Sequence, residues 1–296
     1  MVDLLTKMIK RFLLCSLAIS ITFCASGHHR PFEQDIVPVR DFTEMGKRIQ
    51  GIVSSSPYLT IKQIGHVDYQ NFQAPIWCVS FRPQSPIFSN ILINAGIHGN
   101  EPAGVYYAME LMEKLAKSPA CYRSIAFDII PIVNPWGVTH NIRFNQDGID
   151  INRDFTGLRS QEAKIIQKFV GKRQWDLMLD LHEDPSASGF YVYQYGQSDK
   201  ITSQKIIAAV ERLGYPIEEN VSMVILRTQH GVIDAPMWGL WYMRLSGQLS
   251  AANCYRLYNS PQVFTVETPT APPVEDRIRM QRTAVQLLIQ EHQMIK

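Results

Sequence analysis

The sequence has few cysteines and no paired cysteine motif of the kind that holds a metal ion. It contains five in 296 residues, and two of these, Cys15 and Cys24, fall in an apolar N-terminal run. The other three are widely spaced, at Cys78, Cys121 and Cys254. This spacing excludes a cysteine-rich metal site and allows at most one disulfide bridge, with all three pairings open. We expect these three to be small buried residues.

Several common catalytic signatures are also absent. The chain has no phosphate-binding loop, no Gly-x-Ser-x-Gly, no His-Glu-x-x-His and no internal repeat. It also lacks an excess of charge, because the formal net charge is +2 from 29 basic and 27 acidic residues. Removal of the first 27 residues takes away three basic residues and one acidic residue, which leaves a formally neutral chain. Nothing in this balance indicates a nucleic-acid partner.

No hydrophobic run is long enough for a permanent membrane anchor. The apolar run from Phe12 to Ala25 has about 14 residues, whereas a spanning helix needs roughly 20. Basic residues precede the run and small residues follow it, which is typical of a cleaved secretory signal. We therefore predict a signal peptide at residues 1–27, a catalytic domain at residues 28–296, and a periplasmic or extracellular protein without stable membrane insertion. Lipidation at Cys24 is disfavoured because Phe23 stands where a small residue would be expected.

Strand-like apolar runs alternate with helical patterns along the rest of the chain. Strands are predicted at residues 58–65, 75–82, 87–95, 125–133, 175–182, 189–195 and 262–267. Helices are predicted at residues 41–53, 101–115, 160–171, 199–213 and 273–294. Residues 216–260 are rich in Gly, Trp and Tyr, and we expect irregular structure with short elements there. The alternation predicts a single α/β domain whose mixed, mostly parallel, twisted sheet is covered by helices on both faces.

The stretch GIHGNEPAG, residues 96–104, places His98 and Glu101 three positions apart between a predicted strand and a predicted helix. Its glycines allow a tight turn and a close approach of the backbone. Two histidines and one glutamate form a known catalytic zinc set, and His182, at the end of a predicted strand, is the best candidate for the third ligand. The alternative is that Glu101 only stabilises a helix N-terminus and His98 is an ordinary loop residue.

Further elements follow this stretch in a fixed order: an Asn-Pro-x-Gly turn at residues 134–137, Asp-x-Asn-Arg-x-Phe at 150–155, the strand-terminal His182, and Phe-Thr-x-Glu at 264–267. Together with the His-x-x-Glu of residues 98–101, they resemble the M14 family of zinc carboxypeptidases. The resemblance spans residues 90–270, nearly the whole predicted mature chain. It implies a zinc-carboxypeptidase-like fold and one Zn²⁺ per chain.

The resemblance also implies how the metal would be held. His98, Glu101 and His182 would bind Zn²⁺. Asp150 would orient His98 through a hydrogen bond to its ring and so fix its tautomer.

The remaining roles concern the substrate. Arg143 would polarise the scissile carbonyl and stabilise the oxyanion. Asn152 and Arg153 would bind the terminal carboxylate of a substrate, a task that suits the planar guanidinium. Glu267 would accept a proton from the attacking water and return it to the leaving amine. The alternatives are a surface charge for Arg143, a turn cap for the Asn-Arg pair and a solvated strand end for Glu267.

The pattern departs from the digestive carboxypeptidases in two places. Only 83 residues separate His98 from His182, which looks more like the compact bacterial branches. These include murein-peptide amidases and the deacylases related to succinylglutamate desuccinylase and aspartoacylase. The pocket tyrosine of the family has no secure match, and the candidates are Tyr242, Tyr255 and Tyr258.

The sequence therefore favours an exported zinc metallocarboxypeptidase that removes a terminal residue from a peptide, with cell-wall peptides as one substrate class. The alternative enzyme is a zinc-dependent deacylase of N-acyl amino acids, which the export signal disfavours. A non-catalytic peptide-binding relative is a third hypothesis, disfavoured because ligands, base and carboxylate-binding residues are all present.

Overall fold

The computed structural model describes residues 32, 36–196, 200–219, 222–223 and 226–294. The predicted signal peptide, with Cys15 and Cys24, lies outside these residues, so the boundary at residue 28 stays a prediction. Within the part of the chain that is described, no helix combines the length and the apolar character needed to cross a bilayer.

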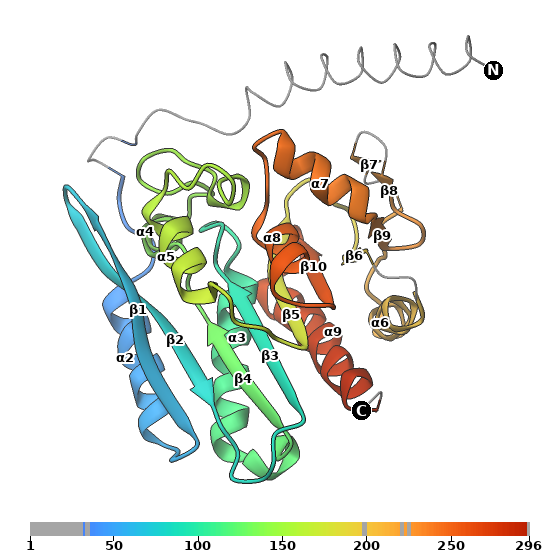
Figure 1. Cartoon of the computed structure of the whole chain (residues 1–296), viewed down its shortest axis with the longest axis horizontal. Helices are drawn as coiled ribbons and strands as arrows, with labels where there is room; N and C mark the ends of the chain where they lie inside the picture. The colour runs from blue at the N-terminus through green and yellow to red at the C-terminus, as the bar shows by residue number, and fades with distance from the viewer. Residues whose placement is uncertain (1–31, 33–35, 197–199, 220–221, 224–225, 295–296) are drawn as a thin grey trace.

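Eight strands form one sheet in the order β1-β2-β4-β3-β5-β10-β6-β9 (Figure 1). The pairs β4-β3, β3-β5, β5-β10 and β6-β9 are parallel, and the other three are antiparallel. The predicted mixed, mostly parallel sheet is thus confirmed. The strands are β1 Leu59–Tyr69, β2 Phe72–Phe81, β3 Ser89–Ala95, β4 Ile125–Ile130, β5 Leu177–Asp184, β6 Tyr191–Tyr195, β9 Val232–Ala235 and β10 Val263–Pro269, and a separate pair is β7 Ser222–Met223 with β8 Leu226–Arg227.

Helices cover both faces of this sheet, as predicted. One apolar core contains residues of four helices: α2 Phe42–Ser54, α3 Pro102–Lys117, α6 Ile201–Glu211 and α9 Val274–Met294. The second core contains residues of the other four: α4 Pro135–His140, α5 Gln161–Val170, α7 Met237–Leu245 and α8 Ala251–Tyr258. Two short 3₁₀ turns, η1 Pro119–Tyr122 and η2 Ile151–Arg153, complete the elements of the described residues.

The central strands are buried on both faces, which explains their nearly continuous apolar sequences. In β3 all residues but one are buried, and in β5 only the last residue is not. Asp180 and His182 are therefore polar exceptions inside an apolar strand. Because β3, β5 and β10 run parallel, their carboxyl ends meet at one edge of the sheet, and this edge carries the site.

Some local predictions were wrong. Residues 216–260 contain short elements, as expected, but two of these are helices, α7 and α8, whose type and bounds were not predicted; the sequence of α7 is aromatic-rich and interrupted by Gly239, so it scores poorly by helix propensity. The Asn-Pro-x-Gly element is not an isolated turn but the start of α4. The hairpin strands run on to a tight turn between Tyr69 and Phe72. Cys121 is exposed, although Cys78 and Cys254 are buried, and these three thiols are free.

Candidate metal centre and active site

The loop after β3 brings two ligands into place through close backbone packing. Gly96 adopts a φ of +64°, which favours glycine. A Cβ on Gly99 would lie 1.9 Å from the carbonyl carbon of Gly137, so only glycine allows the loop to pack against α4. Pro102 then occupies the first turn of α3, and Glu101 is the residue that precedes the helix.

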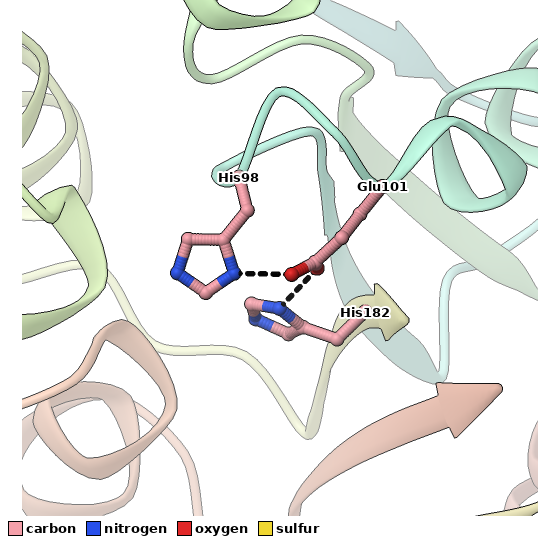
Figure 2. A group of neighbouring side chains, drawn as sticks. All are labelled: His98, Glu101 and His182. Atoms are coloured by element: carbon pink, nitrogen blue, oxygen red, sulfur yellow. Dashed lines mark hydrogen bonds and ion pairs between the residues drawn. The ribbon is translucent and has the colours of Figure 1, made fainter. Parts of the chain in front are cut away.

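His98, Glu101 and His182 meet at the carboxyl edge of the sheet, with the glutamate between the two rings (Figure 2). Nδ1 of His98 lies 2.6 Å from Oε1 of Glu101, and Nδ1 of His182 lies 2.8 Å from Oε2. One ligand atom from each residue can be chosen so that all lie within 4.8 Å of one another. The structure thus brings together the three residues predicted from sequence as ligands.

The three side chains are almost fully buried, with 2–3% of each residue exposed. Burial opposes charge on them, but the two histidines hold the pKa of Glu101 well below its usual range. Burial also lowers the pKa of His182, yet Asp180 and Glu101 raise it well above its ordinary value. Such a concentrated pair of imidazoles and a carboxylate suits a divalent cation, which would replace the hydrogen bonds between the two Nδ1 atoms and Glu101.

Asp150 contacts the other ring nitrogen of His98, and Arg143 extends from Asp150 to the Nδ1 side of the ring. Oδ1 of Asp150 is 3.2 Å from Nε2 of His98, and Arg143 donates from Nε and Nη2 to Oδ2 at 3.1 and 2.9 Å. The remaining terminal nitrogen of Arg143 is 3.5 Å from Oε1 of Glu101. Although burial opposes it, His98 and Arg143 keep the pKa of Asp150 below its usual range. The guanidinium is therefore held beside the metal ligands by a carboxylate.

Glu267 enters the site from β10, directly opposite His182 in the parallel register with β5. Burial raises the pKa of Glu267 to about 8, with Glu101 and Asp184 acting in the same direction, while His182 and Arg143 oppose them. Glu267 is half-buried rather than fully solvated at the end of its strand. A half-buried carboxylate with a raised pKa beside candidate metal ligands is typical of a proton-transfer group.

Asn152 and Arg153 lie in η2, which Asp150 caps by accepting from the backbone N–H of Asn152 at 3.0 Å. Oδ1 of Asn152 accepts from the backbone N–H of Ala251 at 2.9 Å, and Nδ2 lies 3.4 Å from Nε2 of His182. Arg153 is half-buried and donates from Nη1 to the carbonyl of Asn152. The Asn152 side chain thus joins η2 to α8 and to His182. The Arg153 guanidinium has further nitrogens that can donate to other partners.

Residues beyond the predicted set also frame the site. Glu183 accepts from the backbone N–H of Ala103 at 2.7 Å and pairs with Arg277 of α9. Gln281 of the same helix donates to the carbonyl of His182 at 2.7 Å. Sequence analysis missed these contacts because residues nearly a hundred positions apart give no local signal.

The open question of the pocket tyrosine is narrowed. Tyr255 is buried in the core and its hydroxyl accepts from Nδ2 of Asn94, so it does not line a pocket. Tyr258 packs edge-on against Trp241, and Tyr242 is half-buried on α7. Tyr193 on β6, which was not among the predicted candidates, lies opposite Thr265 of β10. Burial raises the pKa of Tyr193, and the Glu267 carboxylate adds to this effect.

The chain resembles known proteins in sequence and in structure. Residues 88–226, just under half of the chain, match the succinylglutamate desuccinylase/aspartoacylase catalytic domain. The structure of carboxypeptidase A from Helicoverpa armigera superposes with a TM-score of 0.63 over 96% of this chain and 81% of that one, at 14% identity. The likeness is therefore to the desuccinylase/aspartoacylase domain in sequence and to a carboxypeptidase in fold. The range of the family match includes the three clustered residues but ends before Glu267.

Other comparisons define how far the likeness of this chain to known proteins extends. A metallo-carboxypeptidase from Burkholderia cenocepacia superposes with a TM-score of 0.63 over 86% of this chain and 69% of that one, at 16% identity. At these identities the structures show the fold alone. Carboxypeptidase 2 of Trichophyton rubrum is 28% identical over 104 residues, and the match covers 34% of this chain but 19% of that protein. The chain therefore spans about a fifth of the curated relative that it matches.

Proposed function

We propose that the chain is a zinc-dependent hydrolase that cleaves an amide bond next to a carboxylate-bearing residue, as a metallocarboxypeptidase does. The observation that carries this proposal is the buried group of His98, Glu101 and His182, two imidazole nitrogens turned onto one carboxylate. Zinc is the metal that this donor set most often holds in hydrolases, with a further position left for water or substrate. Bound zinc supplies Lewis-acid polarisation of the carbonyl and of the attacking water.

In this proposal the surrounding residues perform the proton transfer and stabilise charge. Glu267, opposite His182 in the register, takes the proton from the attacking water and later delivers it to the leaving amine. Arg143, fixed by two hydrogen bonds to Asp150, keeps its remaining nitrogen near Glu101 and stabilises the negative charge that develops on the carbonyl oxygen.

The substrate carries a free carboxylate in this account. Arg153 is the half-buried cation of η2 and would pair with that carboxylate, while Asn152 holds the turn in place. Recognition of a terminal carboxylate restricts cleavage to the last peptide bond, which defines a carboxypeptidase.

The second candidate function is deacylation of N-acyl amino acids. It is favoured by the match of residues 88–226 to the succinylglutamate desuccinylase/aspartoacylase catalytic domain. An N-acyl amino acid also presents an amide bond beside a free carboxylate, so the same metal, base and arginine would serve. The two functions differ only in the acyl side of the scissile bond.

A substrate panel tests this choice. The purified chain of residues 28–296 is incubated with zinc and three sets of compounds: peptides with free C-termini, the same peptides amidated, and N-acyl amino acids such as N-succinylglutamate. We expect release of the C-terminal residue from the free peptides and none from the amides. Hydrolysis of only the N-acyl amino acids would select the deacylase instead.

We further propose that the protein acts outside the cytoplasm on cell-wall peptides, because residues 1–27 read as a secretory signal. A fusion of residues 1–35 to a reporter that is active only after export checks the location. Peptides prepared from peptidoglycan, added to the substrate panel, check the substrate class. Retention of the reporter in the cytoplasm contradicts the first part, and no cleavage of these peptides contradicts the second.

A further inference from the structure

We infer that Asp180 is a positioning residue that holds His182 in the tautomer and orientation needed for metal binding. This inference rests on the proposed zinc site. It gives His182 the same kind of support that Asp150 gives His98, from a carboxylate in the middle of a buried strand rather than in a loop.

Asp180 precedes His182 by two residues on β5, so both side chains lie on the same face of the sheet. Oδ2 of Asp180 is 3.1 Å from Nε2 of His182, and Nδ1 of the same ring faces Glu101. Asp180 is fully buried. The ring therefore lies between two carboxylates, one on each nitrogen.

The proton on Nε2 of His182 has one acceptor among its described neighbours. Asn152 is also near this nitrogen, at 3.4 Å, but through Nδ2, because its Oδ1 accepts from the backbone N–H of Ala251. An amide nitrogen donates and does not accept, so it cannot receive the ring proton. The Nε2 proton thus points to Asp180, which leaves the lone pair of Nδ1 for the metal.

Asp180 belongs to a row of buried polar side chains that crosses the sheet beneath the site. Asn94 on β3 and Thr265 on β10 are its register partners on either side. Asn94 donates to the hydroxyl of Tyr255, and Thr265 is hydrogen-bonded to the hydroxyl of Tyr195 at 2.8 Å. In an apolar core, such a row is unfavourable unless it does something that apolar residues cannot.

Two oxygen atoms of this row are buried without a hydrogen bond to any described residue, which is unfavourable. Within the described part of the chain, Oδ1 of Asp180 and Oδ1 of Asn94 are buried without a hydrogen-bond partner. No lysine or arginine among the described residues forms an ion pair with Asp180, whereas Asp150 is paired with Arg143. Among the described residues, His182 is therefore the donor that Asp180 contacts, through its Nε2–H, and an unsatisfied carboxylate oxygen is retained beside it.

Zinc affinity of purified variants tests the inference. Asp180→Asn keeps the shape of the side chain but removes the charge, and Asp180→Ala removes the acceptor. We expect both to weaken zinc binding by about 10- to 100-fold, measured by competition with a chromophoric chelator. The matched control is Asp128→Asn on β4, whose carboxylate accepts from Ser80, Arg82 and Trp175 and does not contact the site. Its zinc affinity should equal that of the unaltered protein.

A spectroscopic readout separates positioning from mere stability. With Co²⁺ in place of zinc, both Asp180 variants should show a shifted visible absorption spectrum, while Asp128→Asn should not. Thermal unfolding without metal verifies that each variant is folded. Zinc affinity within twofold of the unaltered protein in both Asp180 variants, with an unchanged cobalt spectrum, would overturn the inference. Failure of the unaltered protein to bind zinc would instead contradict the proposed function.

Discussion

Two stretches of the chain contribute to the site in opposite ways. Residues 88–184 place His98, Glu101 and His182 at the ends of strands that are buried on both faces. Residues 226–258 add α8, whose Ala251 donates to Asn152 of the site, and α7, on which only Leu240 is fully buried. Large side chains of this second stretch are exposed: 54% for Trp238, 44% for Trp241 and 86% for Leu245.

The difference shows what fixes the side chains of each stretch in position. A strand in the middle of a sheet fixes its side chains by register, so a histidine at its end has a determined position. Helix α7 packs on the domain through Leu240, Met237 and Met243, so it is fixed less tightly and leaves its tryptophans in contact with water. Arg244 lies over the rings of Trp241 and Tyr258, at 5.4 and 5.5 Å, which holds this surface together without burying it. The first stretch therefore carries the candidate metal ligands, whereas the second presents an exposed aromatic surface.

Loss of a ligand should have the largest effect. His182→Ala leaves one histidine and Glu101, too few protein ligands for a catalytic zinc site. We expect complete loss of hydrolysis and less than a tenth of a zinc ion per chain after desalting, by elemental analysis. His230→Ala is the control, because that histidine is exposed and paired with Glu219; equal zinc in the two variants would contradict the ligand assignment.

Glu267→Gln should lower turnover by about 10²- to 10⁴-fold, because the amide cannot accept the proton of the attacking water. Zinc content should stay at one per chain, since Glu267 is not a ligand. Steady-state kinetics and elemental analysis on the same sample check both statements. A variant with unaltered turnover would remove Glu267 from the mechanism.

Arg277→Gln tests whether the ion pair between α9 and Glu183 stabilises the fold around the site. It leaves the fully buried Glu183 without its cation, and we expect the free energy of unfolding to fall by about 3–5 kcal/mol. Arg282→Gln on the same helix breaks the exposed pair with Glu110 and should change stability by at most about 1 kcal/mol. Urea unfolding measures both changes. Equal losses of stability would show that the Arg277–Glu183 pair stabilises the fold no more than the Arg282–Glu110 pair does.

Arg153→Met tests recognition of the substrate carboxylate. A lost hydrogen bond to a charged group is worth about 1.5–3 kcal/mol, so kcat/KM for a free peptide should fall by roughly 10- to 100-fold. Arg159→Met is the neighbouring control, since Arg159 bonds to Asp154 outside the site; equal effects of the two changes would argue against carboxylate binding by Arg153.

The smallest effect is expected in the second stretch. Trp238→Ala removes an exposed side chain, and its effect on the free energy of unfolding should be within about 0.5 kcal/mol. Trp175 is buried and belongs to the first stretch, residues 88–184. Trp175→Ala should therefore lower the free energy of unfolding by about 3–5 kcal/mol. Similar losses by urea unfolding would erase the contrast between the two stretches.

The sequence predicts the strands that carry the site, because the site residues follow clear apolar runs. The apolar runs before Gly96, before His182 and before Glu267 read as strands, and the structure has β3, β5 and β10 there. Asp180 was missed although it lies two positions before His182, because a single polar residue in a strand gives no sign of its partner. The pairing of Glu183 with Arg277 was missed because it joins residues 94 positions apart. The bounds of α7 and α8 were not predicted, because α7 is aromatic-rich and interrupted by Gly239 and α8 has eight residues, too few for a clear period.

The central claim is that hydrolysis depends on one zinc ion held by His98, Glu101 and His182. The most direct test strips the purified protein with a strong chelator and then titrates zinc back while peptide hydrolysis is followed. The account predicts no activity after chelation and a linear return of activity that reaches its plateau at one zinc per chain. Activity that survives thorough chelation would contradict it.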